Sequence, residues 1–135
     1  MTREPCCAEK PCILIVEDDR AVSNVIGELL EDHGWKVCRA DNGAEALAFL
    51  RSGSCRPLGI LLDLNMPVMD GWQFRERQLA DPAWADIPVI LLSAHLDIET
   101  AASKMGAVDW LNKPVPRRAL LQAVDTLQAR VGRGA

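Results

Sequence analysis

Three acidic side chains follow directly after a short apolar run near the start of the sequence. Glu17, Asp18 and Asp19 come after the run at 12–16, and a further carboxylate, Asp63, ends another apolar run. Carboxylates that crowd together repel one another unless they are protonated, paired with a cation or bound to a hard metal ion. Mg²⁺ prefers such oxygen ligands, so Glu17, Asp18 and Asp63 are candidate metal ligands. Capping of the following helix explains Asp19 equally well, and taken alone it would explain all three acids at 17–19.

Asp63 could itself react with a phosphoryl group. A carboxylate can attack phosphorus to form an acyl phosphate if nearby positive charge neutralises the phosphoryl oxygens. Lys113 could supply an ammonium group, and the Ser93 hydroxyl could bond a phosphoryl oxygen. Each residue alone has an ordinary explanation, as a turn-forming Asp, a solvated Lys and a helix-capping Ser. Their shared position at the ends of apolar runs favours the chemical interpretation.

The apolar runs alternate with segments of helical periodicity. Strands are predicted at 12–16, 35–39, 58–63, 87–93 and 107–111. Helices are predicted at 20–32, 43–51 and 71–79, in a shorter segment after Ser93, and from near Pro116 past Leu127. Right-handed β-α-β crossovers then give a parallel sheet with helices on both faces. Ligands of such folds bind beyond the carboxyl ends of the strands, where the candidate residues stand.

The composition limits the kinds of protein that this chain can be. It has 135 residues, of which 49% are hydrophobic, enough to build one packed domain. The formal net charge is -4 and the sequence pI about 5.1, so we expect no direct binding to nucleic acid or to anionic lipid. No apolar run reaches the length of a membrane span, and the first residues lack a secretory signal, so we expect a cytoplasmic protein.

The expected organisation is a single domain at 12–131, with a flexible leader at 1–11 and a short tail at 132–135. Such a tail is too short for a DNA-binding or enzymatic output module, so we expect output through a partner protein. A disulfide framework is not expected, because the cysteines are odd in number and lack C-x-x-C spacing. They are Cys6, Cys7, Cys12, Cys38 and Cys55, and a role for the first three stays open.

At the candidate site residues, the sequence resembles the receiver domains of two-component response regulators. The resemblance covers about 12–131 and rests on four motifs: Ile15-Val16-Glu17-Asp18-Asp19, Leu62-Asp63-Leu64-Asn65-Met66-Pro67-Val68-Met69-Asp70-Gly71, Leu92-Ser93-Ala94 and Asn112-Lys113-Pro114. It implies a flavodoxin-like α/β fold, with a five-stranded parallel sheet in the order 2-1-3-4-5 and five helices on both faces. It also implies that Asp63 is the phosphoacceptor, charged from the phosphohistidine of a sensor histidine kinase or a histidine phosphotransfer protein.

The resemblance implies a role for each of the other site residues. Asp18 and Asp63 would ligate Mg²⁺ together with the backbone carbonyl of Asn65, and Glu17 would act through water. Ser93 and Lys113 would bind the phosphoryl oxygens, and the Lys113-Pro114 peptide bond would be cis. The chain would be a stoichiometric phosphoacceptor with assisted self-phosphorylation and self-dephosphorylation, not an enzyme. Phosphorylation would switch its interaction with a downstream effector protein.

Some positions depart from the family's usual pattern or leave alternatives open. The switch aromatic on the fifth strand is usually Tyr or Phe, but here it is Trp110, which is either the switch partner of Ser93 or only a core aromatic. The stretch from Ser93 to Lys113 is shorter than is typical, which predicts a short or displaced fourth helix. Asn65 and His95 stand where receivers tune acyl phosphate hydrolysis, although His95 is equally explained as an exposed loop histidine.

Two other classes of protein compete with this interpretation. A phosphorylation-independent interaction module could keep the receiver fold, although the complete set of site residues argues against it. A phosphohydrolase that works through an aspartyl phosphate also needs Asp, Lys and Mg²⁺. The family best known for that chemistry carries a second acid two residues after its nucleophile, where this chain has Asn65.

Overall fold

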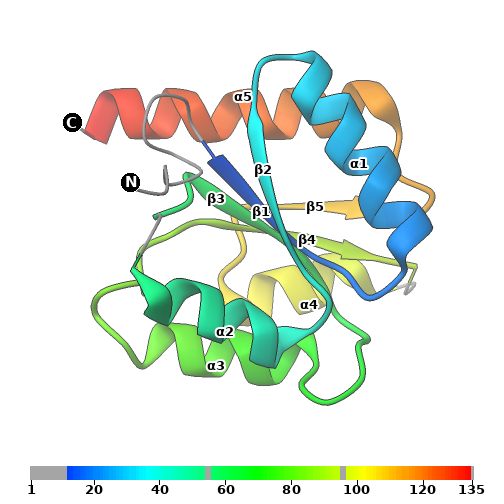
Figure 1. The fold of residues 1–135 in the computed structure, drawn as a ribbon. Helices are drawn as coiled ribbons and strands as arrows, with labels where there is room; N and C mark the ends of the chain where they lie inside the picture. The colour runs from blue at the N-terminus through cyan, green and yellow to red at the C-terminus, as the bar shows by residue number, and fades with distance from the viewer. Residues whose placement is uncertain (1–11, 54–55, 95–96, 135) are drawn as a thin grey trace, which may run out of the picture.

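The computed structural model describes residues 12–53, 56–94 and 97–134, in which strands and helices alternate (Figure 1). The strands are β1 (Cys12–Val16), β2 (Lys36–Ala40), β3 (Gly59–Asp63), β4 (Val89–Ser93) and β5 (Asp109–Asn112). The helices are α1 (Arg20–Asp32), α2 (Gly43–Ser52), α3 (Gly71–Leu79), α4 (Ile98–Met105) and α5 (Arg117–Gly134). All paired strands are parallel, in the order β2-β1-β3-β4-β5. The predicted flavodoxin-like arrangement is confirmed.

Helices cover both faces of the sheet, because successive side chains of each strand point to opposite faces. One buried cluster joins the sheet to α2, α3 and α4, and the other joins it to α1 and α5 on the opposite side (Figure 1). Every residue of β1, β3 and β4 is buried, which explains why these strands appear in the sequence as continuous apolar runs. No helix of the described residues is both long and apolar enough to cross a membrane.

The element boundaries differ slightly from those expected. β2 begins at Lys36, because the Trp35 N–H instead closes α1 by donating to the Leu30 carbonyl at 3.0 Å. β4 begins after Pro88, which has no N–H to add to the ladder, although its carbonyl accepts from Ile60 at 3.0 Å. The shortness predicted for the fourth helix is observed, since α4 has 8 residues. α5 continues to Gly134, so the segment expected as a tail from 132 is helical up to that residue.

A buried arginine that the sequence did not single out ties α3 to the end of α4. Arg75 on α3 is 7% exposed. Its guanidinium donates to the carbonyls of Met105 and Gly106 at 2.8 and 3.1 Å. A third bond, at 2.8 Å, goes to the side-chain oxygen of Gln78. Since the carbonyl end of a helix is its negative pole, the cation lies in a favourable place.

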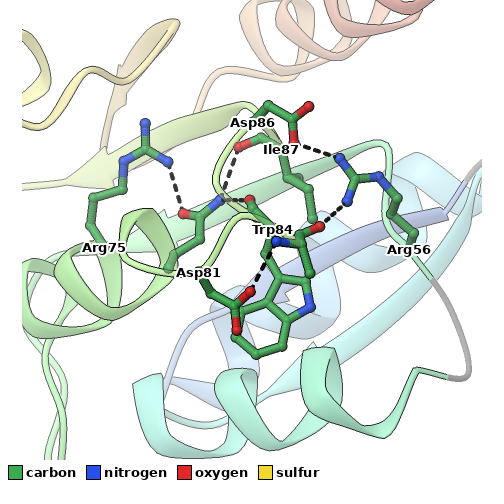
Figure 2. Close-up of polar contacts among 8 residues, drawn as sticks. Arg56, Arg75, Asp81, Trp84, Asp86 and Ile87 are labelled. Carbon is green, nitrogen blue, oxygen red and sulfur yellow. Dashed lines mark hydrogen bonds and ion pairs between the residues drawn. The ribbon is translucent and has the colours of Figure 1, made fainter.

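Gln78 extends this arrangement to the segment that enters β4. Its side chain is fully buried, and the amide nitrogen donates to the carbonyls of Trp84 at 2.8 Å and Ile87 at 3.0 Å. Figure 2 draws these bonds and labels Arg75, Trp84 and Ile87. At the outer edge of the same segment, Arg56 and Asp86 form an exposed ion pair at 2.8 Å. We call the side chains of Arg75 and Gln78, with the carbonyls that they bind, the Arg75–Gln78 cluster.

Candidate functional site

The side chains predicted to form the site come from the carboxyl ends of adjacent strands. Glu17 follows β1, Asp63 ends β3, Ser93 ends β4 and Lys113 follows β5. The register of the parallel pairs keeps these strand ends level with one another. Ser93 and Lys113 are also linked directly, because the Lys113 backbone N–H donates to the Ser93 carbonyl at 2.9 Å. Residues from four separate parts of the chain therefore meet at one edge of the sheet.

Three carboxylates converge at this edge. One oxygen each of Glu17, Asp18 and Asp63 lies within 4.8 Å of the others, and we call this group the acidic cluster. Glu17 and Asp63 are only 1% and 4% exposed, whereas Asp18 is exposed. Burial raises the pKa of both buried carboxyls, and the charge of Asp63 raises the pKa of Glu17 further. The fold therefore holds these acids where ionisation costs free energy unless positive charge is near.

Lys113 supplies one such charge. Its Nζ atom lies 2.6 Å from Glu17 Oε1 and 3.3 Å from Asp63 Oδ1. Burial alone would lower the pKa of Lys113, but its hydrogen bonds and charge interactions with the two carboxylates outweigh burial and raise it. The ammonium group thus stays charged. Three carboxylates facing one ammonium leave two negative charges without a partner in the group.

The chemistry of the acidic cluster fits a Mg²⁺ ion. Its donors are carboxylate oxygens, and a doubly charged cation would offset the two uncompensated charges. Among the described residues, the buried Glu17 Oε1 accepts no well-aligned hydrogen bond, although the Lys113 ammonium lies 2.6 Å away. Among the residues that the structure describes, no other group of three His, Cys, Asp or Glu side chains is arranged to hold a metal ion.

The loop after β3 holds Asp63 through its backbone. The Gly71 N–H donates to the Leu64 carbonyl at 2.9 Å, and a Cβ atom at Gly71 would lie 2.5 Å from the Asp63 carbonyl oxygen. Any larger residue would therefore push the helix away from the strand end. Asp70 caps α3 by accepting from the Gln73 N–H at 2.9 Å, and the Gln73 side chain accepts from the Asp70 N–H at 3.0 Å. The sequence prediction assigned no role to Gly71 in this close packing or to Asp70 as the helix cap. An Asp-Gly pair before a helix could have indicated both.

Asn65 and Ser93 border the acidic cluster in different ways. The Asn65 backbone N–H bonds to Asp63 and opposes the rise in its pKa, but burial outweighs that bond. The expected ligation by the Asn65 carbonyl stays a prediction. Ser93 is 1% exposed at the end of β4, so its hydroxyl lies inside the protein beside the neighbouring strand ends.

Trp110 lies within β5, three residues before Lys113, and not at the end of the strand. It is half-buried on β5, pairs in register with Leu91, and packs with the buried cluster under α2, α3 and α4. Ser93 and Trp110 share this face of the sheet, two register positions apart. The Lys113-Pro114 peptide bond is cis. The predicted residue His95 lies outside the described residues.

Comparisons with known proteins identify relatives of the whole domain. Residues 13–125 match the family model of the response regulator receiver domain. The chain is 33% identical over 120 residues to PilH of Pseudomonas aeruginosa, covering 87% of this chain and 97% of PilH. It is 38% identical over 122 residues to the transcriptional regulatory protein GlrR of Escherichia coli, but that match covers 87% of this chain and only 26% of GlrR.

A solved structure agrees with these matches. The signal receiver domain of a signal transduction histidine kinase from Syntrophus aciditrophicus superimposes with a TM-score of 0.82 at 34% sequence identity. The superposition covers 91% of this chain and 93% of that domain. The likeness therefore extends over about nine tenths of this chain.

Proposed function

The chain belongs to the response regulator receiver domain family, and we propose that it works as a switch in which Asp63 is reversibly phosphorylated. The observation that carries this proposal is the position of Lys113 Nζ, 3.3 Å from Asp63 Oδ1 and beside the acidic cluster. A phosphoryl group on Asp63 would bring more negative charge to a place that already has an ammonium group and oxygen ligands for a divalent cation.

The proposed phosphoryl donor is a phosphohistidine of a sensor kinase or phosphotransfer protein. An Asp63 carboxylate oxygen attacks phosphorus, the P–N bond breaks, and the imidazole leaves and takes up a proton. Lys113 holds a phosphoryl oxygen and helps to keep Asp63 ionised against the effect of burial. Asp18, Asp63 and the Asn65 carbonyl would hold Mg²⁺, with Glu17 acting through water, and the ion would supply further neutralisation of the phosphoryl oxygens.

The switch that we propose passes through the end of β4. The Ser93 hydroxyl donates to a phosphoryl oxygen on Asp63, and the space that it leaves lets the half-buried Trp110 side chain turn further inward. Both residues pack on the same face of the sheet as α4, whose 8 residues form the shortest helix in the described part of the chain. Output then follows from a changed surface that an effector protein recognises.

The match covers 97% of PilH, which leaves little of that relative for a separate output domain, and we propose that this domain acts through protein contacts. The chain spans about a quarter of GlrR, so the transcriptional role in that protein's name does not carry over. We propose that the domain acts stoichiometrically, assisting its own phosphorylation and dephosphorylation instead of turning over a separate substrate.

The proposal is tested with beryllofluoride, a phosphoryl mimic, in the presence of Mg²⁺. We expect a saturable change in tryptophan fluorescence that needs both reagents and disappears in Asp63→Asn. Trp110→Phe is the matched reporter variant: it should still bind beryllofluoride in a calorimetric titration while losing most of the fluorescence change. Phosphorylation by acetyl phosphate, followed by intact mass, should give one phosphoryl group on the wild type and none on Asp63→Asn.

The two competing functions predict different outcomes. If neither fluorescence nor calorimetry detects saturable binding, the chain is a phosphorylation-independent interaction module. Rapid multiple turnover of varied phosphate esters would instead favour a phosphohydrolase. Asn65 stands where the hydrolase family carries its second acid, which argues against the phosphohydrolase.

A further inference from the structure

Two cysteine side chains meet on the sheet face covered by α2, outside the acidic cluster. The sulfur of Cys12 lies 3.2 Å from the sulfur of Cys38. Cys12 is the first residue of β1 and Cys38 is the middle residue of β2, so the contact joins neighbouring parallel strands. Neither residue has a part in the proposed phosphorylation.

We propose that Cys12 and Cys38 form a redox-reactive dithiol that hydrogen peroxide converts to an intramolecular disulfide between β1 and β2. A disulfide requires the sulfurs to lie about 2.05 Å apart, so they must approach by roughly 1 Å. The register sets Cys12 opposite Lys36 and Cys38 opposite Leu14, so the two cysteines lie diagonally across the ladder on the same face. Since the sulfurs already touch, the side chains span this diagonal.

The surroundings assign different roles to the two thiols. Cys38 is partly exposed on the edge strand β2, whereas Cys12 is completely buried. Lys36 lies two residues before Cys38 on the same face and directly opposite Cys12 in the ladder. The thiolate is the form that reacts with peroxide, and a thiol that water reaches forms it more readily than one buried among apolar side chains. Cys38 is therefore the residue that peroxide reaches first, and Cys12 is the resolving thiol.

The chemistry proceeds in two balanced steps. The Cys38 thiolate attacks one peroxide oxygen, the O–O bond breaks, and the departing hydroxide takes a proton to become water, leaving a sulfenic acid. The Cys12 sulfur then attacks the sulfenic sulfur, the S–O bond breaks, and a second water leaves with the Cys12 proton. In total, two thiols lose two hydrogen atoms and one peroxide molecule becomes two waters. Thiol reductants would reverse the bridge by exchange.

The test uses the full chain with Cys6→Ser, Cys7→Ser and Cys55→Ser, which leaves Cys12 and Cys38 as the only cysteines. After treatment with hydrogen peroxide and alkylation, we expect the intact mass of a monomer that has lost two hydrogen atoms. Peptide mapping should recover the segments around Cys12 and Cys38 as one linked pair, which a thiol reductant separates. Two outcomes would overturn the proposal: both thiols stay reduced at peroxide levels that oxidise an unstructured thiol peptide, or the bridge links two chains.

The order of the two steps has its own test. In the same background, Cys12→Ser removes the resolving thiol, so dimedone should label a sulfenic acid at Cys38 that the parent traps only weakly. Cys38→Ser should leave the buried Cys12 unlabelled and open to alkylation only after unfolding. The wild-type chain is then mapped, and a bridge from Cys38 to Cys6, Cys7 or Cys55 in place of Cys12 would also contradict the proposed pair.

Discussion

The acidic cluster and the Arg75–Gln78 cluster both bury charge or polar groups in this domain, but their partners differ. Arg75 gives its three hydrogen bonds to neutral oxygens, from two carbonyls at the end of α4 and the Gln78 side chain. Gln78 in turn donates to two carbonyls before β4 (Figure 2). The protein thus supplies at least one acceptor for each side-chain nitrogen of Arg75 and Gln78. Burial lowers the pKa of Arg75, and no carboxylate in the described part of the chain offsets this shift.

The acidic cluster lacks this internal balance. Lys113 contacts two of its carboxylates, and burial still raises the pKa of both. A polar group satisfied inside the fold contributes to stability, whereas charge left unbalanced inside the fold is stabilised by something that binds. The difference indicates that the Arg75–Gln78 cluster holds α3, α4 and β4 together and that the acidic cluster receives a ligand.

Breaking the Arg75–Gln78 cluster should destabilise the fold strongly. Gln78→Leu removes the acceptor of one Arg75 bond and the donor to the Trp84 and Ile87 carbonyls. We expect a loss of about 3 kcal/mol in the free energy of unfolding, because buried polar groups lose their partners. Urea unfolding followed by circular dichroism measures it. The matched control is Gln122→Leu at an exposed position of α5, which should change stability little. Equal losses in both variants would contradict the proposed difference.

Adding Mg²⁺ should stabilise the folded protein by binding at the acidic cluster. This stabilisation should not depend on the Arg75–Gln78 cluster. At a hundred times its dissociation constant, the ion should raise the free energy of unfolding by about 2.7 kcal/mol. Asp18→Asn changes an exposed ligand and should abolish this response, whereas Gln78→Leu should keep it. Thermal unfolding with Mg²⁺ and with EDTA gives the comparison. A full Mg²⁺ response in Asp18→Asn would show that the ion binds elsewhere.

Removing charge from the acidic cluster should stabilise the metal-free protein. Asp63→Asn replaces a buried carboxylate, whose ionisation burial disfavours, by a neutral side chain of similar shape. We expect the free energy of unfolding in EDTA to rise by about 1 kcal/mol, the opposite sign to Gln78→Leu. The same urea experiment measures it, with Asp41→Asn at a surface ion pair as control. A clear loss of stability would mean that the contact with Lys113 outweighs the cost of burial.

The advantage of Asp63→Asn over the wild type should grow with pH in EDTA. The folded pKa values of Glu17 and Asp63 lie above the ordinary 4.5 and 3.8, so the native state binds more protons than the unfolded state just above those values. Their contribution to the free energy of unfolding therefore falls as pH rises through that window. Melting temperatures of both proteins between about pH 4 and pH 7 provide the test. A difference that stays constant or shrinks would contradict the raised pKa of Asp63.

The smallest effect is expected in the loop beside the acidic cluster. The backbone dihedral angle φ of Val68 is 67°, a left-handed conformation that costs free energy for a β-branched residue. The residue is 81% exposed. Val68→Asn should raise the free energy of unfolding by about 0.5 kcal/mol, because Asn tolerates this conformation. Val25→Asn, at an exposed helical position, should not show this gain. If Val68→Asn is destabilising, the Val68 side chain makes a contact worth more than its strain.

Much of the fold followed from local patterns in the sequence. The apolar runs at 12–16 and 58–63 could be recognised as strands because both their faces are buried, so no alternation interrupts them. β2 was less sharply placed, because it is an edge strand of mixed burial whose start depends on Trp35 closing α1. The end of α5 was also misjudged, since helical periodicity weakens where the sequence turns to Gly and Arg.

The candidate site could be predicted because its residues stand at strand ends, and parallel strands bring their carboxyl ends to one edge. The Arg75–Gln78 cluster could not be predicted from the sequence. Arg and Gln three residues apart on a helix ordinarily mark a solvent-exposed face, and only the packing of α4 and the segment before β4 buries them. The contact between Cys12 and Cys38 likewise could not be predicted from the sequence, because it depends on the register that places the two residues diagonally across β1 and β2.

The sequence by itself determined the alternation of strands and helices, the class of fold and the types of side chain at the strand ends, because these depend on neighbours along the chain. Only the tertiary structure decided the partner of each buried polar group. Lys113 bridges two carboxylates, while Arg75 meets only neutral oxygens. Which of these groups lie within a few ångströms depends on register and helix packing, and at such distances charges in a buried setting interact strongly.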